Sequence, residues 1–418
     1  MNGTLLLTNL KGIWLPIHKE DHSLPGKEMA KCNLLENAFL WIKGGKIEAF
    51  GKMSNLIDDF PESHFLATHQ LDCSGKYVLP SFVDAHSHLV FAAWREGEME
   101  MRLSGKSYLE IAQAGGGILN SARKLALVSE DELFETAYER LETLIKSGTG
   151  ALEIKSGYGL SLESELKMLR VIQRIKQDSP IPIKATFLGA HAIPKEFQNR
   201  HEYIDLIVNE MIPAVAAENL ADYCDVFCDQ GFFTPVETEL ILNQGLKYGL
   251  VPKVHANELA RSGGVQVGVK VGARSVDHLE CVENEELELL SDSQTIPVLL
   301  PGTAFFLGIH PPNARKMIDF NLPVALSSDY NPGTCPSGNM EFTISLGCLL
   351  LKMQPNEAIH AATINSAVAM DVERIAGKIA IGRNANLLLT KQIPSLGFLP
   401  YHFGESSIEK VMVNGHWV

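Results

Sequence analysis

The middle of the chain alternates between short apolar runs and longer segments with helical periodicity. From Tyr77 onward this alternation repeats, which is typical of βαβ units on a parallel sheet. The expected strands lie near residues 77–86, 151–155, 183–191, 224–228, 251–255, 275–278, 296–300 and 324–328. Eight strands separated by helices predict a closed (β/α)8 barrel of the TIM type.

Two of the intervening segments carry clear helix-start patterns. Ser129 and Glu132 form a predicted capping box, and Thr234-Pro235-Val236-Glu237 repeats the pattern. The helix after Ser129 places four apolar residues on one face: Leu133, Ala137, Leu141 and Leu144. These residues indicate structure, and we assign them no catalytic role.

Both ends of the chain have a different pattern, that of short antiparallel strands. Near the start, the expected strands cover residues 5–7, 39–42 and 47–50, with a turn at Gly44-Gly45. Near the end, they cover 387–389 and 411–413, followed by a turn at Asn414-Gly415. Neither end has enough apolar residues for its own core. We therefore predict a small composite β-sandwich domain from residues 1–76 and 372–418, interrupted by a barrel over 77–371.

Composition narrows the classes of function. The chain has 418 residues, 45% of them hydrophobic, which is enough for one large core or two. A net charge of −14 without a long basic run argues against a nucleic-acid partner. No apolar run approaches the roughly 20 residues of a membrane helix, and the start lacks a basic segment. We expect a cytoplasmic protein without a membrane partner, and its seven scattered cysteines indicate neither disulfides nor a thiolate metal site.

Ligand-type side chains stand at several of the predicted strand ends. The first strand runs into Asp84-Ala85-His86-Ser87-His88, where alternation places both imidazoles on one face. The fifth strand ends at His255, and Asp329 follows the eighth. A lone His-x-His often occurs by chance, but catalytic groups of such barrels gather at these strand ends. We predict a site for one divalent metal, Zn²⁺ or Fe²⁺, that lowers the pKa of bound water toward ~7.

Two further side chains at the same rim suit the hydrolysis of an amide. Glu258, three residues after His255, can carry a proton from water to the departing nitrogen. His278 ends the sixth strand, where it can stabilise the developing oxyanion. The alternatives are that Glu258 is a carboxylate on a loop face and that His278 is a buried structural histidine. Asp329 can also act as the general base. The sequence alone does not decide how this role is divided between Asp329 and Glu258.

The segment Phe82-Val83-Asp84-Ala85-His86-Ser87-His88, together with His255, His278 and Asp329, resembles the amidohydrolase superfamily. The resemblance spans the barrel and both flanking β segments. Many two-metal members carry a carboxylated lysine at the end of the fourth strand, but this chain has Asp225-Val226-Phe227-Cys228-Asp229 there. The chain thus resembles the one-metal branch, which includes cytosine deaminase, guanine deaminase and imidazolonepropionase.

Three secondary motifs resemble the imidazolonepropionases within that branch. They are Lys155-Ser156-Gly157-Tyr158-Gly159-Leu160, Gly189-Ala190-His191 and Asp329-Tyr330-Asn331-Pro332-Gly333-Thr334. The resemblance implies hydrolysis of the cyclic amide of 4-imidazolone-5-propanoate to N-formimidoyl-L-glutamate, a step of histidine degradation. It also implies a homodimer, and substrate contacts at seven residues: Arg95, Tyr158, His191, Glu258, Asn331, Gly333 and Thr334.

Each of these contacts has a physical rationale and an alternative. The guanidinium of Arg95 can bind the propanoate carboxylate through two parallel hydrogen bonds, although it can also be a surface charge. Tyr158 and His191 can bond ring nitrogens or serve as core residues. The turn over 331–334 can offer backbone N–H groups to an anion or be a plain turn.

Two rival functions remain open at the level of the sequence. An aminohydrolase of a purine or pyrimidine would use the same metal ligands and release ammonia. A barrel relative without catalysis, acting as a binding protein, would be expected to lack metal ligands that are present here.

Overall fold

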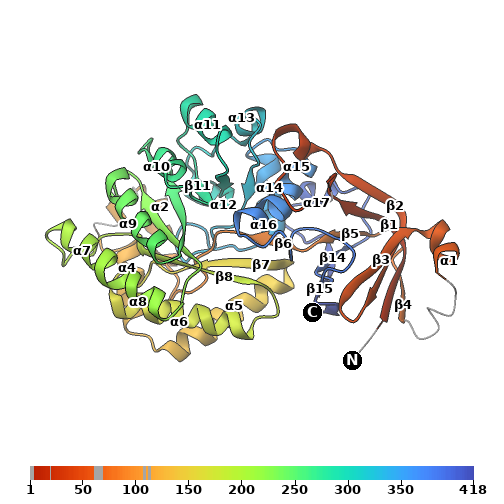
Figure 1. Ribbon diagram of the computed structural model, residues 1–418, viewed down its shortest axis with the longest axis horizontal. Coiled ribbons are helices and arrows are strands. Elements are labelled where there is room, and N and C mark those ends of the chain that lie inside the picture. Colours follow the sequence, from red (N-terminus) through yellow and green to blue (C-terminus); the bar gives the residue numbers. More distant parts are fainter. Residues whose placement is uncertain (1–3, 19, 61–68, 107–109, 112–113) are drawn as a thin grey trace.

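The computed structural model describes residues 4–18, 20–60, 69–106, 110–111 and 114–418, and its strands form two sheets (Figure 1). One sheet is the barrel, in which each strand pairs in parallel with the next along the chain. Its strands are β6 (Phe82–Asp84), β7 (Thr149–Lys155), β8 (Ile183–Ala190), β9 (Tyr223–Cys228), β10 (Val251–Ala256), β11 (Ser275–His278), β12 (Ile296–Leu299) and β13 (Ala325–Leu326). The order and direction of these strands confirm the predicted (β/α)8 barrel.

The barrel closes between its first and last strands through the residues that follow them. The N–H of Asp329 donates to the carbonyl of His86 at 3.0 Å, and the N–H of His88 donates to the carbonyl of Tyr330 at 2.8 Å. Closure therefore brings two segments about 240 residues apart in the sequence against each other at the rim. The two histidines of the His-x-His motif and Asp329 lie in this seam.

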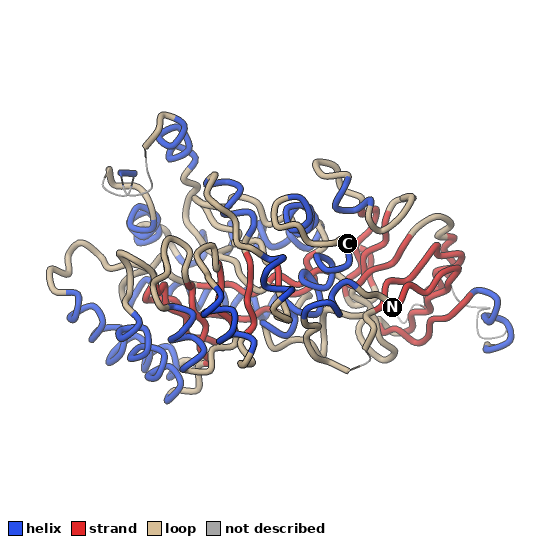
Figure 2. Tube along the Cα trace, turned by 90° about the horizontal axis from the view of Figure 1, so that it is seen from above, coloured by secondary structure: helices blue, strands red, loops and turns tan. Residues whose placement is uncertain are grey.

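The helices follow the strands and cover the outside of the barrel (Figures 1 and 2). The longer α-helices are α2 (Glu96–Leu103), α4 (Ile118–Ala126), α5 (Glu130–Lys146), α6 (Leu162–Asp178), α9 (Pro235–Lys247), α11 (Asn284–Ser291) and α14 (Met340–Leu349). The shorter ones are α1 (Leu56–Asp59), α7 (Arg200–Leu206), α8 (Ile212–Ala217), α10 (Gly264–Lys270), α12 (Pro301–Leu307), α13 (Ala314–Asp319), α15 (Pro355–His360), α16 (Ser366–Ala369) and α17 (Phe398–Tyr401). Two π-helices, Ile207–Met211 and Ala361–Asn365, and two 3-10 helices, Gly26–Ala30 and Met53–Asn55, complete the described set.

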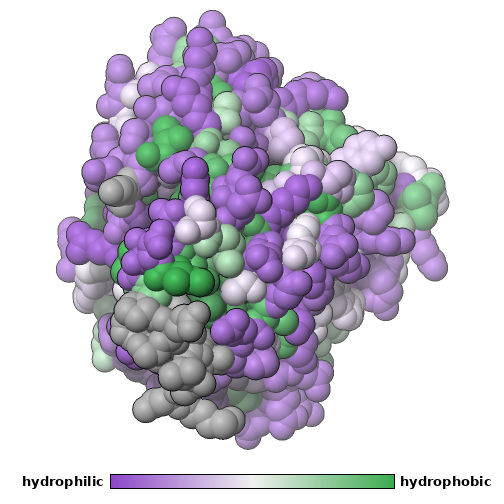
Figure 3. Space-filling view, turned by 90° about the vertical axis from the view of Figure 1, so that its right-hand side faces the viewer, coloured by the Kyte–Doolittle hydropathy of each residue, from purple (hydrophilic) through white to green (hydrophobic). Residues whose placement is uncertain are grey.

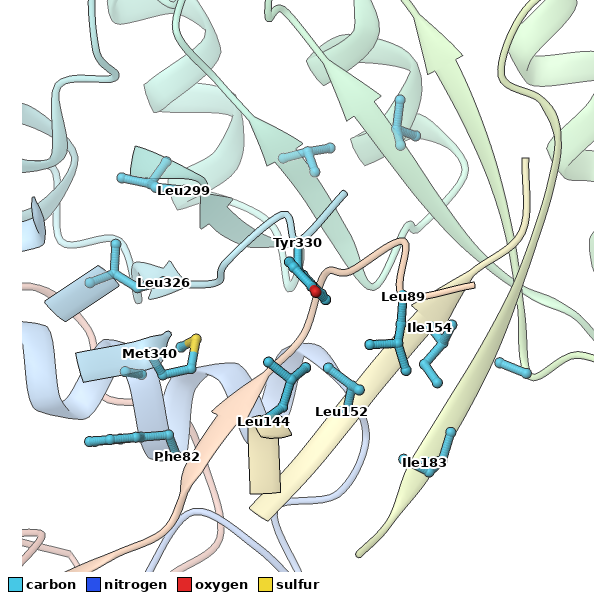
Figure 4. Close-up of a cluster of buried hydrophobic side chains, with 14 of the residues drawn as sticks. Phe82, Leu89, Leu144, Leu152, Ile154, Ile183, Leu299, Leu326, Tyr330 and Met340 are labelled. Carbon is cyan, nitrogen blue, oxygen red and sulfur yellow. The ribbon is translucent and has the colours of Figure 1, made fainter. Parts of the chain in front are cut away.

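Both predicted capping boxes are present, at the starts of α5 and α9. The apolar face predicted for α5 is buried, and its residue Leu144 meets Phe82 of β6 and Leu152 of β7 in the main core (Figure 4). The helix thus packs on the strands because its apolar residues recur at intervals of three and four. Among the described residues, no helix has the length and apolar character needed to cross a bilayer.

The second sheet, here called the terminal sheet, is mixed and contains strands from both ends of the chain. Its strands are β1 (Thr4–Leu15), β2 (Asn33–Lys43), β3 (Lys46–Lys52), β4 (His69–Asp72), β5 (Tyr77–Pro80), β14 (Leu387–Thr390), β15 (Ile408–Val413) and β16 (His416–Trp417). They share one apolar core, which includes Leu7 and Leu40 from the start and Leu389 and Met412 from the end. This confirms that the two ends build one unit, and its outer face is mostly hydrophilic (Figure 3).

The terminal strands form a single hydrogen-bonded sheet, whereas the sequence led us to expect a sandwich. The reason is the long strand β1, which pairs with β4 through residues 5–8 and with β5 through residues 12–13. Its register shifts between Leu7 and Leu10 on the side that faces β2. One irregular strand therefore joins pieces that would otherwise form two layers.

The segment 77–86, expected as one strand, is two strands in different sheets. Strand β5 pairs with β1 and β14, while β6 pairs with β7 in the barrel. The N–H of Ser81 donates to Asn386 and that of Phe82 to Gly148, so the chain changes partners between these residues. Pro80 has no N–H with which to continue the first ladder. Pro80 and Ser81 interrupt the apolar run at this point, but our prediction joined the two sides into one strand.

Candidate metal centre and active site

Three of the four predicted metal ligands meet at the barrel rim. His86, His88 and His255, here called the imidazole cluster, each offer a nitrogen, and these nitrogens lie within 4.8 Å of one another. All three side chains are buried. The Nε2 atoms of His86 and His255 have no hydrogen-bond partner. Leaving buried polar atoms unpaired is costly, and imidazole nitrogens are common metal ligands. The cluster is therefore a metal site, and its donor set fits one divalent cation.

Asp329 lies against the imidazole cluster, as expected for the fourth ligand. Its Oδ1 is 3.5 Å from His86 Nε2 and 3.7 Å from His88 Nε2. Thr303 donates a hydrogen bond from Oγ1 to the other carboxylate oxygen. Burial raises the pKa of Asp329 above its ordinary value. A neighbouring cation would favour the charged carboxylate, so the surroundings of Asp329 suit metal coordination.

Carboxylates that the sequence analysis did not single out lie against the far sides of two cluster rings, with a hydrogen bond to His86 and an ion-pair contact to His255. His86 Nδ1 is 2.6 Å from Asp277 Oδ2, and His255 Nδ1 is 3.0 Å from Asp225 Oδ2. A carboxylate at Nδ1 fixes the ring orientation and leaves Nε2 for a metal. Both aspartates lie within strands, in β9 and β11, and both are fully buried. The sequence signal that could have identified these two aspartates is a charged residue inside a predicted buried strand.

Glu258 and His278 lie together beside the imidazole cluster. Glu258 Oε2 is 3.8 Å from His278 Nδ1, and the His278 ring centroid is 5.4 Å from that of His255. Burial, with contributions from Glu280 and Asp329, raises the pKa of Glu258 to about 7. A carboxyl group with such a pKa can both accept and donate a proton near neutral pH. The structure thus brings the predicted proton carrier to the expected place.

The His278 imidazole is positively charged in these surroundings. Burial alone would lower its pKa, but Glu258, Glu280 and Asp329 outweigh burial and raise the pKa to about 10. Glu280 was not predicted from the sequence; its Oε2 is 3.8 Å from His278 Nδ1. The backbone of His278 has φ of +81°, a conformation that is rare for a residue with a side chain. This unusual backbone turns the chain directly after β11.

A cavity of about 280 Å³ opens over these groups. Its lining includes ten of the predicted site residues: His88, Arg95, Tyr158, His191, His255, Glu258, His278, Asp329, Asn331 and Thr334. His86 lies behind the lining, and Gly333 lies beside it under Arg95. The volume suits a small molecule, which a pocket with a few convergent polar groups would orient.

Tyr158 and His191 form one wall of this cavity. The His191 ring stacks on that of His88, with centroids 5.2 Å apart and planes 10° from parallel. Burial and the neighbouring His255 lower the pKa of His191 to about 3, so the ring is neutral. Its Nδ1 lies 2.9 Å from the carbonyl oxygen of Gly157. A Cβ at Gly157 would come within 2.7 Å of this nitrogen, and φ there is +101°, so the ring requires a glycine at that place.

Arg95 also lines this cavity, and two nitrogens of its buried guanidinium lack a hydrogen-bond partner. Only 5% of the residue is exposed, and its Nε and Nη1 atoms make no hydrogen bond. Its nearest carboxylate is Glu98, whose Oε2 is 3.5 Å from Nε. A Cβ at Gly333 would lie 1.6 Å from Arg95 Nη2, so only glycine allows the guanidinium to take this place. An unpaired buried guanidinium is a site for an anionic group.

The turn over 331–334 differs from the expectation in one respect. The N–H groups of Gly333 and Thr334 both donate to Asn331 Oδ1, at 2.8 and 2.7 Å, and so they are already used within the turn. An asparagine that bonds its own following backbone accounts for this. The Asn331 side chain is also used within the turn, because its Nδ2 donates to the carbonyl of Asp329 and to Thr334 Oγ1. The turn therefore offers mainly the space over Gly333, and the cation beside it that can bind an anion is Arg95.

Comparison with known proteins agrees with this geometry. Residues 238–418 match the model of the amidohydrolase family. The chain is 47% identical over 413 residues to imidazolonepropionase of Christiangramia forsetii, with 99% of each chain covered. It is 49% identical over 391 residues to imidazolonepropionase of Flavobacterium johnsoniae, with 93% of this chain and 94% of the other covered.

Solved structures of more distant proteins share the fold. Guanine deaminase of E. coli superposes with a TM-score of 0.73 at 16% identity, covering 100% of this chain and 99% of that one. An atrazine chlorohydrolase of Arthrobacter aurescens, complexed with zinc, gives 0.73 at 16% identity, covering 99% and 94%. At such identities the likeness concerns the fold alone. The near-complete matches at 47% and 49% identity, together with the imidazole cluster, show that the chain belongs to the imidazolonepropionase family of amidohydrolases.

Proposed function

We propose that the chain hydrolyses the ring amide of 4-imidazolone-5-propanoate to N-formimidoyl-L-glutamate, in the degradation of histidine. The observation that carries this proposal is the convergence of three features on one cavity of about 280 Å³. These are the imidazole cluster, the carboxyl group of Glu258 and the unpaired guanidinium of Arg95. A small cyclic amide that also bears a carboxylate needs all three.

Arg95 binds the propanoate group of the substrate. Its Nη1 makes no hydrogen bond in the buried side chain, so it has N–H donors to give to the substrate carboxylate. Tyr158 and His191 hold the imidazolone ring, because both are buried and line the cavity. Asn331 and Thr334 line it on the side of the turn. These contacts place the ring carbonyl near the metal side of the cavity.

The metal centre consists of His86, His88, His255 and Asp329, and Zn²⁺ or Fe²⁺ suits this donor set. A divalent cation held there would supply a Lewis acid that lowers the pKa of water and polarises the ring carbonyl. Asp329 faces the same space through Oδ1, while Thr303 holds its Oδ2.

The chain's own groups handle the protons and the charge. The oxygen of water bonds to the ring carbonyl carbon, and Glu258 or Asp329 accepts the proton that water loses. The positively charged His278 stabilises the oxygen that gains negative charge. The bond between the carbonyl carbon and the ring nitrogen then breaks, and Glu258 donates to that nitrogen the proton that it accepted directly or received from Asp329. The pKa of about 7 suits Glu258 to both transfers.

The direct test combines metal analysis with identification of the product. Freshly purified protein should contain about one divalent metal per chain and convert imidazolone propanoate to formimidoyl-glutamate without releasing ammonia. Guanine and cytosine should not be turned over. Ammonia release from either base would instead favour an aminohydrolase, and a metal-free, inactive protein would favour a binding function.

A substitution separates the proton carrier from the metal site. Glu258→Gln should reduce turnover by about 10²–10⁴-fold, because the amide cannot shuttle a proton. Metal content should be unchanged, since Glu258 is not among the ligands that we propose. Wild-type turnover by this variant, with metal bound, would refute the role of Glu258. Glu218→Gln, which removes an exposed ion pair to Arg170, is the matched surface control.

A further inference from the structure

A layer of charged side chains lies inside the barrel directly beneath the imidazole cluster. It comprises Glu153, Lys155, Asp225, Lys253 and Asp277, here called the interior charge layer, and the side chains of all five have no exposed surface. They come from strands β7, β9, β10 and β11. Burying five charges is expensive unless they are paired with one another, so their arrangement calls for an explanation.

Lys155 is the centre of this layer. Its Nζ donates to Glu153 Oε1 at 2.7 Å and to Asp225 Oδ2 at 2.8 Å, and it lies 3.4 Å from Asp277 Oδ2. Burial alone would lower the pKa of Lys155, but the three carboxylates outweigh burial and raise it above its ordinary value. The group is therefore an ammonium ion that contacts three carboxylates at once.

The two aspartates that Lys155 contacts are the ones that hold cluster rings. Asp225 Oδ2 is 3.0 Å from His255 Nδ1, and Asp277 Oδ2 is 2.6 Å from His86 Nδ1. In both aspartates the oxygen nearest Lys155 is also the oxygen nearest the imidazole. The ammonium group thus bridges two carboxylate–imidazole pairs that come from four different strands or strand ends.

We propose that Lys155 is a positioning residue of the metal centre, which acts through Asp225 and Asp277 on the rings of His255 and His86. By fixing both aspartates, it holds the two rings so that their Nε2 atoms face the common space. Without the ammonium group, the aspartates would repel each other and release the rings from this orientation. The inference rests on the metal site of the proposed function, and it extends that site to a residue that contacts neither metal nor substrate.

Lys253 provides an internal comparison, since it is the second lysine of the layer and equally buried. Its Nζ bonds to Glu153 and lies 3.5 Å from the carbonyl of Ala85. Among the contacts of the described residues, it has none with Asp225 or Asp277. The loss of either lysine removes one buried positive charge, but only the loss of Lys155 should disturb the imidazole cluster.

The test measures metal affinity directly, without reference to turnover. Metal-free wild type, Lys155→Met and Lys253→Met are titrated with Co²⁺ in competition with a chelator, and the visible absorption of bound Co²⁺ reports its coordination geometry. We expect affinity to fall by about 10–100-fold in Lys155→Met, with an altered Co²⁺ spectrum. Lys253→Met should stay within about threefold of wild type and keep its spectrum.

Equal affinity and spectrum in Lys155→Met and wild type would overturn the inference and leave the proposed function intact. An equal loss in both lysine variants would also overturn it, because the effect would then be general destabilisation of the layer. If wild type itself bound no Co²⁺, the proposed metal centre would be refuted, and the positioning role of Lys155 would be refuted with it. Should the methionine variants not fold, Lys155→Gln and Lys253→Gln form the matched pair, judged by the same criteria.

Discussion

The rim of the barrel and the interior charge layer beneath it are both buried and polar, yet their hydrogen bonding differs. At the rim, His86 Nε2, His255 Nε2 and two nitrogens of Arg95 have no partner. In the interior charge layer, the described side chains leave no buried atom unpaired. Since an unpaired buried polar atom costs about 1–3 kcal/mol, such atoms are retained where a ligand satisfies them. The rim is therefore arranged for ligands, and the layer below is arranged to hold the rim.

The two regions also differ in how charge is balanced. Glu153 bonds to Lys155, Lys253 and Thr186, and the two lysines outweigh the effect of burial and lower its pKa. At the rim, burial depresses the pKa of His86 and His88 far below the ordinary value, so both rings are neutral and available to a cation. Apart from Lys155, whose positioning role we propose above, substitutions in the two regions should thus differ. Those at the rim should affect ligand binding, and those in the interior charge layer should affect stability.

The largest effect is expected for His255→Ala at the rim. Removal of one imidazole from the cluster should abolish tight metal binding and reduce turnover by at least about 10⁴-fold, since the metal activates the water. The metal-free variant should unfold at nearly the same urea concentration as metal-free wild type. Turnover, metal content and urea unfolding are the measurements. Retention of metal with normal activity would remove His255 from the centre.

The next largest effect is expected for Glu153→Gln in the interior charge layer. The amide leaves Lys253 without its carboxylate and Lys155 with one fewer, and the removal of one member of a buried ion pair typically costs 3–5 kcal/mol. We expect the free energy of unfolding of the metal-free protein to fall by that amount. Urea unfolding of the metal-free protein measures it. A loss below about 1 kcal/mol would show that the layer contributes little to the fold.

Sequence patterns predicted the barrel because apolar runs alternate with helical segments, two of which begin with a predicted capping box. They predicted the rim because His86, His88, His255 and Asp329 follow strand ends, where barrels carry their chemistry. The prediction missed the change of sheets at Ser81, because it joined the apolar residues on both sides of Pro80-Ser81 into one strand. Nor did it show that a single strand, β1, joins the terminal sheet.

The interior charge layer was missed for a different reason. Its members stand within strands, so a search of strand ends passes over them. Glu153 and Lys155 alternate in β7, and Lys253 precedes His255 by two residues in β10, so each pair shares one face of its strand. Charged residues in otherwise apolar parallel strands were a usable signal for an interior network. Which carboxylate holds which ring depends on contacts between residues 30 to 191 positions apart, and these emerge only in three dimensions.

A third prediction concerns the rim alone and separates binding from chemistry. Arg95→Gln removes the unpaired guanidinium but leaves the imidazole cluster untouched. We expect kcat/KM for imidazolone propanoate to fall by about 10²–10³-fold, mainly through KM, because a charge-assisted pair to the carboxylate is lost. Metal content and unfolding should match wild type. Steady-state kinetics test this prediction, and an unchanged KM would place the carboxylate elsewhere in the cavity.

The smallest effect is expected for Thr303→Val, at a residue that supports the rim through a hydrogen bond to Asp329. Its hydroxyl donates to Asp329 Oδ2, and the residue is fully buried. Thr303→Val keeps the shape and removes only this donor. Hydrogen bonds to charged groups are worth about 1.5–3 kcal/mol, so kcat/KM should fall by about 10–100-fold. The loss should appear mainly in kcat, because Asp329 faces the reacting groups and not the propanoate.

Thr186→Val, which removes a donor to Glu153 in the layer below, is the matched control. It should lower stability and spare kcat; a comparable fall in kcat in both variants would erase the distinction between rim and layer.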